Sequence, residues 1–343
     1  MITPSPVEIH GGRFYNEDCI QGAKRHLPDS SVDLIVTDPP YGINGDLLHK
    51  HYNRKEGFVV DGYVEVPAAE YSAFSHRWIE QAARVLRPGG QIYVVSGYTH
   101  LLAILEALRD AGLEDINHII WKYNFGVVTR TKYVSSHYHI LYCAKPGGKR
   151  TFNTESRFGL REKDSQGQSL NYEDREDVWM INREYKPGQV KNKNELPMAL
   201  LTKMIQYSSG EADLVADFFL GGFSTARVAL ELNRRIVGFE ISRGIFKARI
   251  PEMRKVVPGR LLSDLRVPRI DTLDHQGRKW TEAETDSLLR RYYDLRKKRT
   301  KKATVEVLIR EFGRGRFSIE KVLSRQKPEH QDEPRLAALT DFN

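Results

Sequence analysis

Apolar runs rich in β-branched residues alternate with helical periodicity along most of the chain. From Tyr71 to Val85 apolar residues recur at intervals of three and four, which predicts a helix with one buried face that stops at Pro88-Gly89-Gly90. Phe74 and Trp78 are therefore expected in the core rather than on a base-stacking surface. The pattern elsewhere predicts strands at residues 32–36, 91–95, 116–121, 138–143 and 236–240, and helices at 19–27, 101–108 and 195–207. This alternation predicts an α/β fold with a doubly wound, mostly parallel sheet.

Beyond Pro258 the pattern changes to three short amphipathic segments. Thr281 and Glu284 have the spacing of a capping box, which predicts the start of a helix. Apolar residues at 305–312 predict a second helix that ends at Gly313, and Ser318 is expected to cap a third. The expected organisation is a larger α/β domain at 1–258, a small all-α domain at 272–327 and a loosely ordered end at 328–343.

The formal net charge of +8 is concentrated in the small helical domain. Residues 278–325 contain 15 Lys and Arg but only 7 Asp and Glu, so the remainder of the chain is close to neutral. A charge gathered in one segment favours a module that binds a polyanion. A basic tail that is simply solvated would have the same composition.

Cysteine usage and hydropathy narrow the class of protein. Two cysteines, Cys19 and Cys143, are too few for a disulfide framework or a cysteine metal cluster. No apolar run approaches the length of a membrane span, and the N-terminus lacks the pattern of a signal peptide. We therefore expect a cytoplasmic protein without a metal site or a membrane partner.

The sequence Asp38-Pro39-Pro40-Tyr41 directly follows the strand predicted at 32–36. Two prolines prevent the strand from continuing, so the chain leaves the sheet at its carboxyl edge, where open α/β sheets bind ligands. Asp38 and the Pro39 carbonyl provide two acceptors for an exocyclic amino group, and Tyr41 provides a ring that stacks on a base. Two such acceptors would free the nitrogen lone pair for attack. The alternative interpretation is a proline-rich strand exit with no chemical role.

A second group of candidate residues lies between Asp213 and Thr225, where a strand, a glycine turn and a helix start are expected. The next strand ends at Glu240, an acid placed to bind ribose hydroxyls. The turn lacks the G-x-G-x-x-G pattern of dinucleotide sites, which favours a nucleoside cofactor without a pyrophosphate.

Three polar segments interrupt the regular pattern. Residues 42–66 are expected to form a lid or a substrate-contacting loop because they follow the candidate base-binding residues. Residues 122–136 form a basic loop that contains Arg130 and Lys132. The insertion at 147–194 is either a target-recognition segment or a surface loop without a role.

Together these motifs resemble the DNA amino-methyltransferases that use S-adenosylmethionine. Asp38-Pro39-Pro40-Tyr41 is similar to the family's catalytic tetrad, and Asp217 to Thr225 is similar to its cofactor motif D-P-F-x-G-x-G-T-T. The tetrad precedes the cofactor motif, which is the β arrangement of the family. The resemblance implies a Rossmann-like methyltransferase sheet and a cofactor site. The residues implied for that site are Asp18, Cys19, Asp217, Phe219, Gly221, Gly222, Ser224, Thr225 and Glu240.

The chain departs from the family pattern at three places. Phe218 and Phe223 replace the Pro and the second Gly of the cofactor motif, and Phe223 is expected to narrow the cofactor pocket. The segment at 193–199 lacks the usual His and Gln-Lys pair, although Pro197 and Leu200 match.

The activity implied by the resemblance is methyl transfer from S-adenosylmethionine to adenine N6 of a flipped base in double-stranded DNA, as in restriction-modification enzymes. Cytosine N4, an amino group of structured RNA, and a catalytically inert DNA-binding protein are the alternatives. Relatives of the β arrangement are often dimers, which leaves a homodimer open. The helical domain loosely resembles a Myb-like or helix-turn-helix unit. The expected DNA contacts are Arg130, Lys132, Lys297, Lys298, Lys301 and Lys302.

Overall fold

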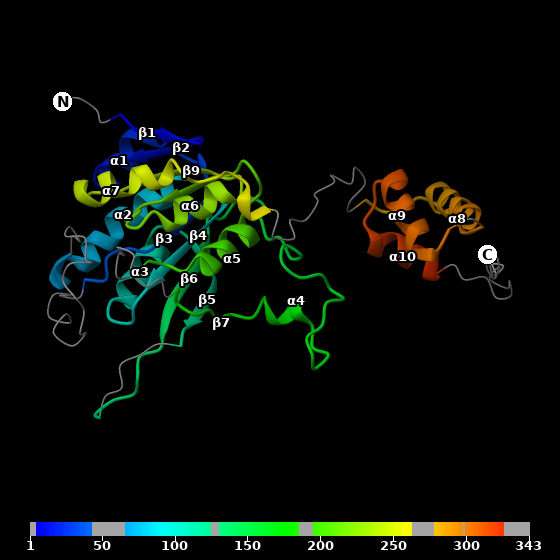
Figure 1. Cartoon of the computed structure of the whole chain (residues 1–343), viewed down its shortest axis with the longest axis horizontal. Coiled ribbons are helices and arrows are strands. Elements are labelled where there is room, and N and C mark those ends of the chain that lie inside the picture. The colour runs from blue at the N-terminus through cyan, green and yellow to red at the C-terminus, as the bar shows by residue number, and fades with distance from the viewer. Residues whose placement is uncertain are drawn as a thin grey trace, which may run out of the picture. The chain divides into compact units, whose positions relative to one another are not determined.

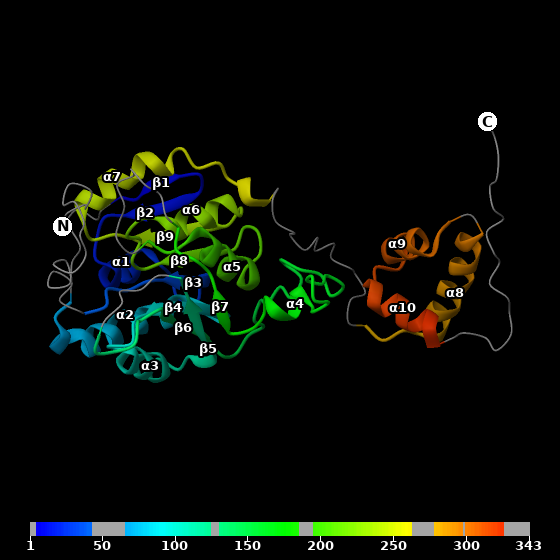
Figure 2. The same ribbon diagram turned by 60° about the horizontal axis from the view of Figure 1, so that its bottom comes forward.

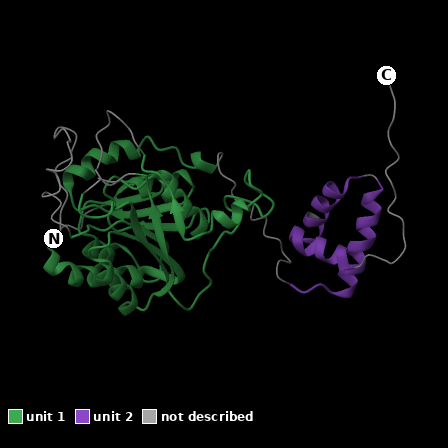
Figure 3. Ribbon diagram, turned by 90° about the horizontal axis from the view of Figure 1, so that it is seen from below, with its two compact units in different colours: residues 1–268 green, residues 269–343 purple. Residues whose placement is uncertain are grey.

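The computed structural model describes residues 5–42, 66–124, 130–184, 195–262, 278–297 and 299–325. The chain divides into two compact units, Met1–Pro268 and Arg269–Asn343 (Figure 3). In the described residues, no helix is both long enough and apolar enough to cross a membrane.

The first unit is built on one nine-stranded sheet with the order β1-β2-β9-β8-β3-β4-β6-β5-β7 (Figures 1 and 2). Strands β2, β9, β8, β3 and β4 are mutually parallel, so their carboxyl ends meet at one edge. Strand β6 runs antiparallel to β4 and β5, and β1 runs antiparallel to β2. The strands are β1 (Val7–Ile9), β2 (Gly12–Tyr15), β3 (Val32–Thr37), β4 (Leu86–Ser96), β5 (Glu114–Lys122), β6 (His137–Ala144), β7 (Val178–Met180), β8 (Leu214–Asp217) and β9 (Arg235–Phe239).

Helices cover both faces of this sheet, which confirms the predicted doubly wound, mostly parallel α/β fold. One face packs on α1, α2 and α3, and the other on α5, α6 and α7 (Figures 1 and 2). Strand β3 is buried on both faces because its successive side chains alternate between the two cores, as its continuous apolar run predicts. The helices are α1 (Cys19–His26), α2 (Tyr71–Val85, preceded by the 3₁₀ turn η3, Ala68–Glu70), α3 (Leu101–Asp110), α4 (Leu170–Glu173), α5 (Met198–Ser208), α6 (Ser224–Glu231) and α7 (Arg243–Met253), with the 3₁₀ turn η4 (Arg260–Leu262) after them.

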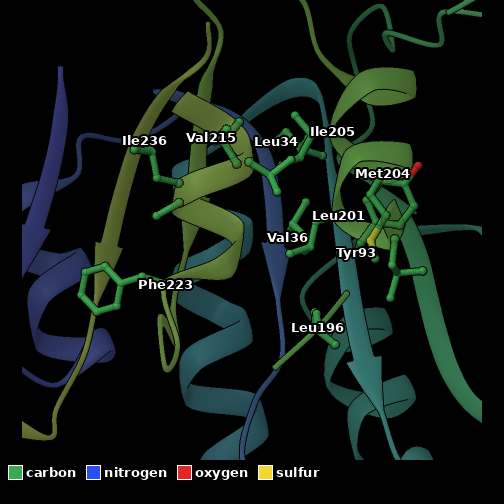
Figure 4. Close-up of a cluster of buried hydrophobic side chains, with 14 of the residues drawn as sticks. Leu34, Val36, Tyr93, Leu196, Leu201, Met204, Ile205, Val215, Phe223 and Ile236 are labelled. Atoms are coloured by element: carbon green, nitrogen blue, oxygen red, sulfur yellow. The ribbon is translucent and has the colours of Figure 1, made fainter. Parts of the chain in front are cut away.

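Figure 4 shows how the strands and the α5–α6 layer meet. Leu34 and Val36 from β3 face Leu201 and Ile205 from α5, and all four side chains are fully buried. Trp78 is likewise fully buried on the opposite face. The predicted core position of the α2 stripe is therefore confirmed.

Two predicted helix boundaries differ from the structure. The helix predicted from residue 195 begins at Met198, because Pro197 is extended at the N-cap and the Glu184 carboxylate accepts the Met198 N–H at 2.8 Å. Helix α2 ends at Val85 rather than at Pro88-Gly89-Gly90. Those three residues belong to β4, where the Gly89 N–H donates to the Lys145 carbonyl at 2.8 Å.

The insertion predicted at 147–194 is described up to residue 184, and within this part it is anchored to the sheet and to α5. Strand β7 extends the sheet by pairing with β5, so Trp179 lies beside Trp121. Asp174 accepts a hydrogen bond from the Tyr207 hydroxyl at 2.6 Å and forms ion pairs with Arg157 at 2.9 Å and Lys203 at 3.5 Å. The described part of the insertion is thus fixed by buried polar contacts.

The second unit contains α8 (Glu282–Arg296), α9 (Lys301–Phe312) and α10 (Arg316–Arg325). Leu288, Leu308 and Ile319 form its core, one from each helix. The capping box of Thr281 and Glu284 is present, and Gly313 ends α9 in the left-handed region. Ser318 does not cap α10, which begins two residues earlier; its hydroxyl accepts the indole N–H of Trp280 at 2.9 Å.

Candidate functional site

The residues Asp38 to Tyr41 leave the sheet at the carboxyl end of β3, which lies between β8 and β4. Asp38 is partly buried and Pro39 is fully enclosed. The Tyr41 hydroxyl donates to Oδ1 of Asp38 at 2.7 Å. This bond occupies one lone pair of Asp38 and leaves the rest of the carboxylate available to accept from a ligand.

The charge state of Asp38 is finely balanced. Its pKa is raised to about 7, chiefly by burial and also by the neighbouring Asp217 carboxylate, against the opposing effects of the Tyr41 hydroxyl and the Arg183 guanidinium. Asp38 therefore changes protonation near neutral pH. Its ionised form, which accepts hydrogen bonds at both oxygens, predominates only above that pH.

Thr37 and Asp217 join the two candidate motifs. The Thr37 hydroxyl donates to Oδ1 of Asp217 at 2.9 Å, although the two residues are 180 positions apart in the chain. The same oxygen accepts the Phe219 N–H at 3.0 Å, and burial raises the pKa of Asp217 to about 6. Asp217 thus fixes the glycine turn after β8 directly beside the residues that lead into Asp38.

Glu240, at the carboxyl end of β9, closes the other side of the glycine turn. Its Oε2 accepts the Gly221 N–H at 2.9 Å, and its Oε1 accepts the Ser242 N–H at 2.7 Å. Burial raises the pKa of Glu240 to about 6. A carboxylate has about four acceptor positions, so two remain for donors such as vicinal hydroxyl groups.

The glycine turn has no room for a side chain at Gly222. A Cβ placed there would lie 2.5 Å from Cγ of Glu195, whose Oε1 accepts from Arg249 at 2.7 Å. Gly221 adopts a positive φ of 48°, and Ser224 begins α6, in which Thr225 is buried. The predicted residues of this motif are therefore brought together in one tight turn.

The segment from Asn16 to Cys19 reaches the same edge of the sheet. The Asn16 amide donates to the Glu240 carbonyl at 2.7 Å. Asp18 caps α1 by accepting the Gln21 N–H at 2.9 Å, and the buried Cys19 thiol has a pKa raised well above its usual value, chiefly by burial. Asn16 thus holds the segment that leads into α1 against Glu240, and Asp18 and Cys19 begin that helix.

The expectation that Phe223 narrows the cofactor pocket is wrong, because its ring lies in the core. The ring is 1% exposed and packs 5.4 Å from that of Phe14 on β2 and 5.9 Å from that of Phe246 on α7. Phe218 is equally buried, against Trp78 and Phe239. The two phenylalanines that depart from the family motif therefore extend the hydrophobic cores on the two faces of the sheet.

Phe219 contacts the core through its side chain and the turn through its backbone. Its ring packs edge-on against Trp78 at 5.4 Å, and only its N–H reaches Asp217.

A cavity of about 290 Å³ lies between α1 and α2, lined by Asp18, Ile20, Gln21, Lys24, Arg77 and Glu80. Asp18 is the single residue that it shares with the predicted set, so this cavity is separate from the edge formed by Asp38, Asp217 and Glu240.

The predicted DNA contacts come from both units. Arg130 and Lys132 are exposed between β5 and β6 in the first unit. Lys297, Lys301 and Lys302 are exposed at the end of α8 and the start of α9 in the second unit. Lys298 lies outside the described residues.

Among the part of the chain that the structure describes, no group of three or more His, Cys, Asp or Glu residues is arranged to hold a metal.

Sequence reasoning missed an aromatic cluster beside the tetrad. The Tyr138 ring lies 5.6 Å from that of Tyr41 and 5.5 Å from both Trp121 and Tyr123. Arg183 lies over the rings of Trp121, Tyr123 and Tyr138. All come from the ends of β5, β6 and the chain after β7, which reach the same edge as β3. The signal in the sequence is the spacing of two between Trp121 and Tyr123 at the end of a predicted strand.

Comparisons with known proteins agree with this arrangement. The N6_N4_Mtase family model, described as DNA methylase, matches residues 32–250. Type II methyltransferase M.HpaI of Haemophilus parainfluenzae is 29% identical over 281 residues, which cover 79% of this chain and 80% of that protein. Type II methyltransferase M.BamHI of Bacillus amyloliquefaciens is 29% identical over 262 residues, which cover 71% of this chain and 58% of that protein.

Two solved structures share the fold. One, described as a putative DNA modification methylase from Thermus thermophilus complexed with S-adenosyl-L-methionine, has a TM-score of 0.52 at 24% identity and covers 72% of this chain and 95% of that one. The other, PvuII DNA methyltransferase (cytosine-N4-specific), has a TM-score of 0.53 at 15% identity, and the match covers 77% of this chain and 94% of that one.

Proposed function

Because this chain belongs to the DNA methylase family, we propose that it transfers a methyl group from S-adenosylmethionine to adenine N6 in double-stranded DNA. The observation that carries this proposal is the Thr37–Asp217 hydrogen bond of 2.9 Å. It places a two-acceptor amino-group site and a glycine turn flanked by an acid at adjacent strand ends, as transfer between two bound ligands requires.

The residues at the glycine turn fit S-adenosylmethionine. Glu240 keeps acceptor positions for the ribose hydroxyls, and Gly221, whose N–H donates to Glu240, carries no side chain that would block the approach of a ligand to the backbone. Asp18 is placed to accept from the adenine amino group. When bound, S-adenosylmethionine supplies an electrophilic methyl group on a positively charged sulfur. One of the solved structures that share the fold is described as complexed with S-adenosyl-L-methionine, which supports this assignment.

The tetrad would act on the target base by orientation. Asp38 and the Pro39 carbonyl accept the two amino N–H groups, which turns the nitrogen lone pair toward the methyl donor. Tyr41 stacks on the base, which must leave the duplex to reach this edge of the sheet. Adenine is proposed because the form Asp-Pro-Pro-Tyr is commoner in enzymes that act on adenine.

The test is a transfer assay with labelled S-adenosylmethionine and genomic duplex DNA, followed by mass spectrometry of the nucleosides. N6-methyladenine is the expected product. N4-methylcytosine would assign the same mechanism to the other base, and methylation of RNA alone would replace DNA as the substrate. The absence of any methylated nucleoside would favour an inert DNA-binding protein, although the core positions of Phe218 and Phe223 support an intact cofactor turn.

Glu240 should make cofactor binding dependent on pH. The ionised carboxylate accepts from hydroxyl groups, so protonation weakens binding as the pH falls through the pKa of about 6. We expect calorimetry to give roughly tenfold weaker S-adenosylmethionine binding at pH 5 than at pH 7.5. In Glu240→Gln, binding should be weak at both pH values. Glu106→Gln, an exposed change on α3, should retain the wild-type profile; an equal loss in both variants would contradict a cofactor role for Glu240.

We also propose that the second unit binds DNA. Helices α9 and α10 are joined by a short turn at Gly313, Arg314 and Gly315, the arrangement of a helix-turn-helix. Ion pairs occupy several of its acids: Glu284 contacts Arg314, Glu311 contacts Arg291, and Glu306 contacts Arg316. All the charged residues from Arg296 to Lys302, which span the turn between α8 and α9, are Lys or Arg. The excess positive charge is therefore exposed there.

Lys301→Ala/Lys302→Ala should weaken DNA binding and reduce its salt dependence. If both side chains contact phosphates, the slope of log affinity against log salt should fall by about 2. Fluorescence anisotropy with a labelled duplex over a salt series measures both quantities. Lys247→Ala/Lys255→Ala, which removes two exposed charges from the first unit, is the matched control. An unchanged slope in the first variant would exclude these two lysines as phosphate contacts.

A further inference from the structure

Arg183 is held by aromatic rings in the proposed methyl-transfer site. Its guanidinium carbon lies 5.0 Å from the ring centre of Tyr123, 5.1 Å from that of Tyr138 and 5.7 Å from that of Trp121. Its Nε is buried and has no hydrogen-bond partner within the ranges that the structure describes. A cation in this position is stabilised by the faces of the rings, and it keeps a donor that no protein group uses.

The three rings are firmly placed, so they fix Arg183 in turn. Trp121 is 1% exposed, and its indole N–H donates to the Ile181 carbonyl at 2.8 Å, two residues before Arg183. Tyr123 is 8% exposed, and its N–H donates to the Ser136 carbonyl at 3.0 Å. The position of Arg183 is therefore set by the ends of β5, β6 and β7 together.

The same cluster is continuous with the tetrad. The Tyr138 ring contacts both Arg183 and Tyr41, whose ring centre lies 5.6 Å away, and the Tyr41 hydroxyl donates to Asp38 at 2.7 Å. The groups that act electrostatically on Asp38 are Asp217 from β8, Arg183 from the chain after β7, and Tyr41 from its own loop. Arg183 is the one cation among these three groups.

We propose that Arg183 is a positioning residue whose guanidinium favours the ionised form of the Asp38 carboxylate and supports the aromatic wall against which Tyr41 packs. This inference rests on the proposed function, in which the ionised form of Asp38 accepts the amino N–H of the target base. A carboxylate that is partly buried beside Asp217 needs such a counter-charge, because burial and a like charge both favour the protonated form. A cation stacked on rings supplies this charge without covering the oxygens that the base must reach.

The first test is the pH profile of kcat for methyl transfer in Arg183→Met and Arg183→Lys. Loss of the positive charge raises the pKa of Asp38, so the acid limb in Arg183→Met should move to higher pH by about one unit, a tenfold change in proton affinity. Arg183→Lys keeps the charge, so its acid limb should lie close to that of wild type. Arg161→Met, which removes an exposed charge from the same insertion, should leave the acid limb unchanged.

A second measurement does not depend on turnover. The carboxyl carbon of Asp38, identified in a ¹³C-aspartate spectrum by its loss in Asp38→Asn, can be titrated in wild type and in both Arg183 variants. The pKa of Asp38 is expected to be higher in Arg183→Met than in wild type and close to the wild-type value in Arg183→Lys. This result would be obtained even if the protein methylates nothing. An unchanged titration in Arg183→Met would overturn the inference. Weaker DNA binding with a flatter salt dependence and an unshifted acid limb would also overturn it and identify Arg183 as a phosphate contact.

Discussion

Asp38→Asn is expected to lower kcat for methyl transfer at pH 8 by about 10²–10³-fold while S-adenosylmethionine still binds. Asparagine preserves the shape of the side chain and can still accept from the Tyr41 hydroxyl, which now lies 2.7 Å from Oδ1. It removes the negative charge, however, and replaces one acceptor with an N–H₂ donor that opposes the amino group of the base. Single-turnover assays with saturating cofactor and duplex measure this loss directly.

The stability of the same variant gives an independent measurement. The folded pKa of Asp38, about 7, lies well above the value of an unfolded aspartate, so ionisation of Asp38 destabilises the fold as the pH rises from about 4 to 7. Asp38→Asn avoids this cost. Its free energy of unfolding should therefore exceed that of wild type at pH 8, by an amount on the order of 3 kcal/mol, and match it near pH 4.

Asp177→Asn, an exposed change in the insertion, serves as the matched control and should alter neither activity nor stability. A variant of Asp38 that keeps wild-type kcat would remove the tetrad from the mechanism. A variant that loses activity together with cofactor binding and thermal stability would indicate a structural role for Asp38 instead. The expected combination, an inactive but stabilised protein, is characteristic of a buried functional charge.

The meeting of the two motifs was predictable because it depends on backbone rules. A buried apolar run interrupted by Pro39 and Pro40 must leave the sheet, and parallel strands place their ends at one edge. Thr37 and Asp217 could thus be placed near each other despite their separation in sequence. The 2.9 Å bond itself was not predictable, because register between β3 and β8 depends on side-chain packing across the sheet.

Side-chain direction explains most of what the sequence left undetermined. Phe223 occupies a position that the motif associates with the cofactor, but its backbone has a φ of 62° and its ring lies among Phe14 and Phe246. The antiparallel direction of β6 was equally hidden, because an apolar run at 138–143 has the same pattern in either direction. Arg183 was missed because the rings that hold it come from separate strands.

The anchoring of the insertion gives the second large effect. Asp174→Asn is expected to lower the free energy of unfolding by about 3–5 kcal/mol at pH 7. Lys203 is 6% exposed and lies 4.5 Å from the ring centre of Trp179, so without Asp174 its ammonium group would lose its ion-pair partner and keep only the weaker attraction of Glu176. Denaturant titration followed by tryptophan fluorescence measures the loss. Glu173→Gln, the exposed neighbour, should cost little.

The sign of the pH dependence separates charge from packing in this cluster. Burial lowers the pKa of Lys203 and Asp174 raises it, so the variant's lysine should lose its proton more readily and the deficit of Asp174→Asn should shrink between pH 7 and pH 10. Asp174→Asn/Lys203→Met should recover much of the stability at pH 7 because no unpaired ammonium remains. A deficit that stays constant with pH and persists in the double variant would instead assign the effect to the Tyr207 hydroxyl bond of 2.6 Å.

Because Asp174 anchors the segment that leads into β7 and Arg183, Asp174→Asn should also reduce methyl transfer, and Asp174→Asn/Lys203→Met should restore it to the extent that stability returns.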